Sequence, residues 1–172
     1  MPHARHHFRV TDARQLVAKR YSAPSPQSAI DTSNRQAVVD AFRTLYLGAL
    51  AVPNDWNGDA ATCVAGTTSA AYVDATMQMV NYFRGMTGLT TSLPHNPTKD
   101  AKAQQAALMM EANQSLSHVP PTSWKCYTAD GAEAAGLSNL AGGIAGAAAV
   151  EAYLRDGSDL GHRRWVLLPT ET

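Results

Sequence analysis

The stretch that decides the fold is SAAYVDATMQMVNYFRGMTG, which occupies residues 69–88. Its apolar side chains recur every three or four residues, which is the spacing of one face of an α-helix. Thr68 or Ser69 supplies a hydroxyl group for the helix N-terminus, and Gly88 stands where a helix C-terminus favours glycine. The stretch therefore predicts a long amphipathic helix with an apolar face made of Tyr72, Thr76, Met79, Val80, Phe83 and Met86.

Three further segments show helical spacing. They are residues 35–51, which Pro53 terminates, a segment that opens at Thr98 or Asp100 and ends near His118, and residues 144–155. Residues 164–168, just before a proline, instead predict the beginning of a β-strand. Residues 122–139 combine aromatic residues with glycine and alanine, and they predict an irregular connection with one extended piece.

The composition is typical of one globular domain, with 172 residues, 45% of them hydrophobic and 16% charged. Fourteen basic and fourteen acidic residues cancel, which disfavours nucleic acid as a partner. No stretch reaches about 18 uncharged apolar residues, so no transmembrane segment is expected. Residues 1–34 combine a basic N-terminal segment, which shows no signal peptide and is expected to be disordered, with a Ser- and Pro-rich linker from residue 21 onward. We expect a helix with a cysteine-containing loop at 35–67 and the main domain at 68–172.

The two cysteines, Cys63 and Cys126, lie in separate loops and outside any CxxC or metal-ligand spacing. A disulfide between them would close a loop of about 63 residues, add about 4 kcal/mol of stability and indicate an oxidising compartment. The alternative is a pair of buried free thiols that pack as small hydrophobic groups.

Two histidines stand at positions from which a side chain could serve a site. His118 precedes Val119 and two prolines that hold the chain extended, and His162 lies at the start of the predicted strand. On spacing alone, a structural hydrogen-bonding role is the more common one for each. The sequence contains no GxSxG elbow, HExxH helix, Walker loop or GxGxxG motif, which makes nucleotide chemistry improbable.

Six short motifs follow one another between residues 70 and 169. They are Val80-Asn81-Tyr82-Phe83-Arg84 with Gly88-Leu89, Ala103-Gln104 with Met109-Met110, Leu116-Ser117-His118, Ser138-Asn139-Leu140-Ala141, Ala149-Val150 with Tyr153 and Asp156, and Gly161-His162-Arg163. In this order they resemble the CAP superfamily, which comprises cysteine-rich secretory, antigen 5 and pathogenesis-related-1 proteins. The bacterial SCP-like branch is most similar, because Trp124-Lys125-Cys126-Tyr127 and Gly161-His162-Arg163-Arg164-Trp165 also have counterparts there.

The resemblance implies an α+β fold, an α-β-α sandwich, whose central cleft carries two histidines and two acidic residues that can hold a divalent metal. His118 and His162 match the two family histidines, and Asp156 stands where the family often has Glu. Ser138 stands where the other acid is expected, and serine is a poor ligand. The implied metal ligands are therefore His118, His162 and Asp156, with zinc or another divalent cation as the cofactor. Because family members continue beyond the strand at 165–168, the last sheet strands are expected to be missing.

These observations predict a secreted, non-enzymatic binding module whose partner is a small ligand, a lipid or a protein. The resemblance and the cysteines together imply the extracellular location. One alternative is a metal-dependent hydrolase with His118 or His162 as general base, although Ser138 and the absence of a fixed nucleophile disfavour it. Another alternative is a lipid or sterol carrier, which the resemblance permits for parts of the superfamily.

Overall fold

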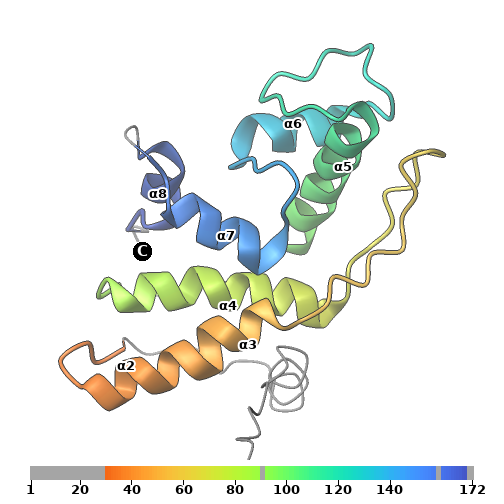
Figure 1. Ribbon diagram of the computed structural model, residues 1–172. Helices are drawn as coiled ribbons and strands as arrows, with labels where there is room; N and C mark the ends of the chain where they lie inside the picture. The colour runs from red at the N-terminus through yellow and green to blue at the C-terminus, as the bar shows by residue number, and fades with distance from the viewer. Residues whose placement is uncertain (1–29, 90–91, 158–159, 170–172) are drawn as a thin grey trace, which may run out of the picture.

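The computed structural model of the chain describes residues 30–89, 92–157 and 160–169 (Figure 1). In these ranges the regular secondary structure is helical, apart from one isolated antiparallel bridge between Asp59 and Val64. The elements are α2 (Arg35–Ala41), the π-helical segment η1 (Phe42–Tyr46), α3 (Leu47–Leu50), α4 (Ala70–Met86), α5 (Pro97–Asn113), α6 (Ala129–Leu137), α7 (Gly146–Leu154) and α8 (Gly161–Val166). The helix-rich prediction is confirmed. Of the N-terminal segment predicted at 1–34, residues 1–29 lie outside the described ranges, whereas Ile30 packs against the larger core and Asn34 caps α2.

Membrane-spanning helices were not expected from the sequence. In the described part of the chain, no helix combines the length and the hydrophobicity needed to cross a bilayer.

The long amphipathic helix predicted first is α4, which lies between α3 and α7 (Figure 1). The Ser69 hydroxyl oxygen accepts a hydrogen bond from the Tyr72 N–H at 3.2 Å, as expected of an N-cap residue. Beyond the other end, Gly88 has a φ of +83°, and the Leu89 N–H donates to the Arg84 carbonyl at 2.9 Å. The sequence thus predicts both ends of this helix correctly.

The helices form two groups, each with its own core (Figure 1). The larger group contains α2, η1, α3, α4, α7 and α8, and its buried residues are Ala41, Ala49, Ala75, Met79, Tyr82, Ala147 and Val150. In the smaller group α5 packs on α6, and its buried residues are Ala106, Met110, Ala134 and Ala135. Because most of these residues are alanines, the helix axes can approach closely in both groups.

Helix α6 corrects the prediction of an irregular connection over residues 122–139. The Thr128 hydroxyl oxygen accepts from the Gly131 N–H at 3.0 Å and caps the helix. A Cβ at Gly131 would lie 2.9 Å from Cε of Met109, so the glycine lets α6 approach α5. The glycine that suggested a loop is therefore a packing residue. Helix α5 also ends earlier than predicted, because Gln114 adopts a left-handed conformation with φ of +49°.

The predicted strand at 164–168 is wrong, because Gly161–Val166 forms α8. The apolar side chains of this segment do not divide between two faces of a sheet. Trp165 is 71% exposed and Leu168 is also exposed, while Val166 packs against the larger core. A short apolar run does not distinguish helix from strand, and contacts to distant residues decide the structure here.

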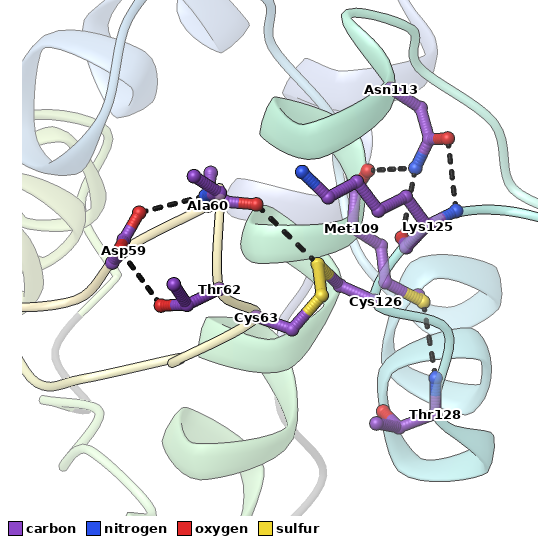
Figure 2. Close-up of a disulfide and its surroundings, with 10 residues drawn as sticks. Asp59, Ala60, Thr62, Cys63, Met109, Asn113, Lys125, Cys126 and Thr128 are labelled. Carbon is purple, nitrogen blue, oxygen red and sulfur yellow. Dashed lines mark hydrogen bonds between the residues drawn. A yellow bond between two sulfur atoms is a disulfide. The ribbon is translucent and has the colours of Figure 1, made fainter.

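A disulfide joins Cys63 to Cys126, with Cα atoms 5.1 Å apart (Figure 2). The bond connects the loop between α3 and α4 to the connection between α5 and α6, and so links the two groups of helices. Sγ of Cys126 also lies 3.7 Å from the Ala60 carbonyl oxygen. This is a contact and not a hydrogen bond, since a sulfur in a disulfide carries no proton.

Hydrogen bonds position both sides of the disulfide (Figure 2). On the Cys63 side, the Asp59 carboxylate accepts from the Thr62 hydroxyl at 2.7 Å. On the Cys126 side, the Asn113 side chain accepts from the Lys125 N–H at 3.1 Å and donates to the Lys125 carbonyl at 3.0 Å. The two half-cystines are therefore held in place by local contacts as well as by the bond between them.

Two glycines before and at the start of α7 offer a matched test of this packing. Gly146 has φ of +58° and a Cβ there would lie 2.4 Å from the Tyr72 ring, whereas Gly143 has φ of +73° and open space around it. We expect Gly143→Ala to lower the free energy of unfolding by about 1 kcal/mol through backbone strain alone. Gly146→Ala should cost about 1 kcal/mol more, because the methyl group displaces the Tyr72 ring. Urea unfolding measures both, and equal losses would contradict the α4–α7 contact.

Candidate functional site

Two of the four predicted cleft positions, Asp156 and His162, lie at the corner between α7 and α8. The Asp156 carboxylate accepts hydrogen bonds from the backbone N–H groups of His162, at 2.7 Å, and Arg163, at 3.4 Å. These N–H groups belong to the first turn of α8, where they have no partner within the helix. Asp156 thereby caps α8 from outside, which helps to explain why this segment is a helix.

The Arg163 side chain connects α8 to the C-terminal end of α7. Its Nε donates to the Leu154 carbonyl at 2.8 Å, and its Nη2 donates to the Asp156 carbonyl at 3.0 Å. A guanidinium at the carboxyl end of α7 satisfies free carbonyl groups and complements the helix dipole. Hydrogen bonds therefore join residues 154–156 directly to residues 162–163.

The His162 imidazole lies against the Asp156 carboxylate. Its Nδ1 is 3.2 Å from Oδ1 of Asp156, and the two side chains are 40% and 13% exposed. Burial raises the pKa of Asp156, but hydrogen bonds from His162 and Arg163 outweigh burial and hold the pKa below its ordinary value. An ionised carboxylate only accepts hydrogen bonds, so Nδ1 carries the proton. In the neutral ring, Nε2 then presents a lone pair.

Asn139 connects this corner to the chain that leaves α6. Its side-chain Nδ2 donates to the His162 backbone carbonyl at 3.1 Å, and its own backbone carbonyl oxygen accepts from the Tyr153 hydroxyl at 2.9 Å. Burial raises the pKa of Tyr153, whose ring centroid lies 5.2 Å from that of His162. In the sequence, Asn139, Tyr153 and Arg163 stand out only as motif residues, and their positioning roles are not predicted from it. Their place in three separate motifs was the available signal.

His118 lies in the connection between α5 and α6 and contacts the last turn of α6, and Ser138 follows that helix; neither side chain is hydrogen-bonded to the Asp156 carboxylate among the described residues. Nδ1 of the exposed His118 is 2.7 Å from the Ala135 carbonyl oxygen, so this nitrogen is the donor and Nε2 is free. Ser138 is the C-cap residue of α6 and directly precedes Asn139. The structure thus brings Asp156 and His162 into contact, and it places Ser138 at the C-terminal end of α6 with the His118 ring against the last turn of that helix.

The three expected metal ligands do not form a common ligand set. Asp156 is occupied by His162 and Arg163, and His118 is bonded to α6. Across the described ranges, no group of three or more His, Cys, Asp or Glu side chains is arranged to hold a metal ion. The side chains as they lie therefore do not fit a centre with three protein ligands, and zinc binding stays a prediction.

The comparisons with known proteins identify the family. The family model described as CAP, cysteine-rich secretory protein family, matches residues 77–172, which include all four predicted cleft positions. The chain belongs to the CAP family. Searches of curated proteins and of solved structures returned no match.

The lowered pKa of Asp156 makes its contribution to stability depend on pH. Because the pKa is lower in the folded chain than in the unfolded chain, the ionised carboxylate stabilises the fold above the ordinary pKa of 3.8. This contribution is lost as the pH falls through the lowered value. We expect Asp156→Asn to destabilise the chain at about pH 5, with a difference from wild type that shrinks towards about pH 2.5.

Urea unfolding across this pH range tests the expectation, with the exposed Asp55→Asn as the matched control. The control should show little difference from wild type. A destabilisation by Asp156→Asn that is the same at every pH would contradict the role of the ionised carboxylate.

Proposed function

We propose that the chain is an extracellular, non-enzymatic binding module of the CAP family, and that its ligand site is the Asp156–His162 corner. Membership of the family and the disulfide support the extracellular location. For the architecture we propose the family's α-β-α sandwich, with residues 68–172 as its CAP domain. Residues 35–50 belong with it, because Ala41 and Ala49 share the core of α4 and α7.

The observation that carries the proposal is the hydrogen bond between Asp156 and the His162 ring. It holds Nδ1 as the donor to the carboxylate and leaves Nε2 as a fixed acceptor on a side chain that is 40% exposed. A fixed acceptor loses little conformational entropy when a ligand donates to it. The ligand class that suits this group is a small molecule with an O–H or N–H donor.

Binding is favoured over catalysis by what surrounds the imidazole. In the described part of the chain, the only side chain hydrogen-bonded to the His162 ring is that of Asp156. The nearby Tyr153 hydroxyl donates to the Asn139 carbonyl and has a raised pKa through burial, which makes it a poor nucleophile. No hydroxyl or thiol among the described residues is bonded to His162 as an activated nucleophile would be.

The test is a titration of the oxidised full chain with a panel of small alcohols, phenols and amides, followed by NMR of the histidine ring protons. We expect at least one compound to shift the His162 signals in a saturable way and to lose its binding in His162→Ala. His95→Ala is the matched control, because His95 is an exposed histidine that pairs with Asp100 at the start of α5. The proposal fails if no compound shifts His162, or if binding is unchanged in His162→Ala.

Zinc is the second probe of the Asp156–His162 corner, together with His118. Calorimetric titration of zinc into the oxidised chain, with His118→Ala/His162→Ala as control, tests the expected cation. Micromolar binding that the double substitution abolishes would support a site in which both histidines bind one ion. Binding that survives the double substitution, or no binding by the folded chain, would remove zinc from the proposal while leaving the organic ligand open.

A hydrolase is the one competing function that a specific observation favours. The Asp156–His162 pair has the arrangement of a general base, with Nδ1–H on a carboxylate and Nε2 free to take a proton. Turnover of simple esters or amides that disappears in His162→Ala would favour this function. Binding without turnover would favour the module.

A further inference from the structure

Arg84 is a buried cation in α4, and in the sequence it stands out only as part of a family motif. Its side chain is 1% exposed, and it is among the largest fully buried side chains of the described ranges. Its Nη1 donates to the Leu168 carbonyl at 2.8 Å and to the Val166 carbonyl at 3.2 Å. No carboxylate among the described residues forms an ion pair with it, and its Nε is buried without a partner.

Burying a guanidinium without a paired carboxylate costs free energy, so its hydrogen bonds to backbone carbonyls must offset that cost. Both acceptors lie at the carboxyl end of α8, where the carbonyl groups lack partners within the helix. A positive charge is favourable at this end of a helix. Arg84 therefore satisfies the C-terminal end of α8, just as Asp156 satisfies its N-terminal end.

Helix α8 needs both attachments. It has six residues, too few to be stable as an isolated helix. Several of its side chains face solvent, including Arg164 and Trp165, and only Val166 is packed against the larger core. His162 stands on the first turn of this short helix, so its position follows from where the helix is fixed.

We infer that Arg84 is a positioning residue for His162, which acts by binding the carboxyl end of α8 to α4. With this end fixed, the first turn is held where the Nδ1 of His162 meets Asp156 and the His162 carbonyl meets Asn139. The inference rests on the proposed function in making His162 the recognition group. It concerns the arrangement of the ring, which is measurable without any ligand.

The experiment is ¹⁵N NMR of the imidazole nitrogens in the oxidised full chain, which reports the tautomer of each histidine. In Arg84→Met we expect His162 to lose its fixed Nδ1–H state and to show a mixture of tautomers, while His118 keeps its own. The matched control is Arg164→Met, which removes an exposed arginine from α8 and should leave His162 unchanged. In Arg84→Lys, whose ammonium group can still donate to the Leu168 carbonyl, most of the wild-type signal should return.

An unchanged His162 in folded Arg84→Met would overturn the inference. Equal changes at His118 and His162 would also overturn it, because they would indicate a general loss of structure. If Arg84→Met does not fold, Arg84→Gln takes its place, because the shorter neutral amide cannot reach both carbonyls. An unchanged His162 tautomer in Arg84→Gln would then contradict the inference. If the His162 tautomer changes in the Arg84 variants but the wild-type chain binds no compound of the panel, the proposed function is rejected and this inference stands.

Discussion

Replacement of both half-cystines, in Cys63→Ser/Cys126→Ser, is expected to lower the free energy of unfolding by about 4 kcal/mol. The bond spans 63 residues, and a closed loop of that length restricts the unfolded chain strongly. It also links the two groups of helices, which have separate cores. We therefore expect the unfolding transition of the whole chain to move to lower urea concentration. We also expect local unfolding of the α5–α6 group to cost less free energy.

Urea unfolding of the oxidised wild type and of the double variant measures this effect. The reduced wild type is the matched comparison, since it removes the bond and keeps both residues, and the double variant under the same reductant controls for the reagent. The reduced wild type should resemble the double variant. A loss below about 1 kcal/mol would mean that the bond contributes little beyond the contacts of Asp59 and Asn113 that already hold its two sides.

Met79→Ala is the second large effect, and we expect a loss of about 3 kcal/mol. Met79 is fully buried in α4, in the core shared by Ala75, Tyr82 and Val150. Its removal leaves a cavity that the small residues around it cannot fill. The effect combines lost burial of the methionine side chain with the cost of the cavity.

Met77→Ala is the matched control for this substitution, because Met77 lies on the same helix and is only half-buried. Its loss should be less than half that of Met79→Ala. Urea or thermal unfolding of both variants decides the point. Equal losses would contradict the orientation of α4, on which the positions of α7 and the candidate site depend.

Local patterns predicted the helices that carry their own signals. Residues 69–88 show apolar periodicity, a serine cap and a terminal glycine, and α4 follows that prediction closely. The first helical region is confirmed in α2, η1 and α3, and the Ala-rich segment before Arg155 is confirmed in α7. In each case, the pattern within a single segment is sufficient.

Residues whose structure depends on distant partners were predicted less well. Gly131 favours a loop when only its neighbours are considered, yet its close approach to Met109 makes it a helical packing position. Helix α8 is held by Asp156 at one end and by Arg84, more than 80 residues earlier in the sequence, at the other. No local pattern contains these contacts, and the short apolar run at 164–168 taken by itself therefore favours a strand.

In the candidate site, too, some features can be predicted from the sequence, and others depend on contacts between distant residues. Resemblance to the family identified Asp156 and His162, and the structure places them in contact. The resemblance did not indicate that Asp156 would be occupied by the backbone of α8, or that Asn139 and Tyr153 would connect the corner to the end of α6. Those are tertiary hydrogen bonds, and only the arrangement of α6, α7 and α8 brings their partners together.

The central claim is that Asp156 fixes the His162 ring with its proton on Nδ1 and its lone pair on Nε2. The most direct measurement is ¹⁵N NMR of the neutral imidazole in the wild-type chain and in Asp156→Ala. We predict a single Nδ1–H tautomer for His162 in the wild type and a change towards the Nε2–H tautomer in the variant, with His118 unaffected. An Nε2–H or mixed His162 in the wild type, or the same His162 tautomer in both chains, would contradict the claim.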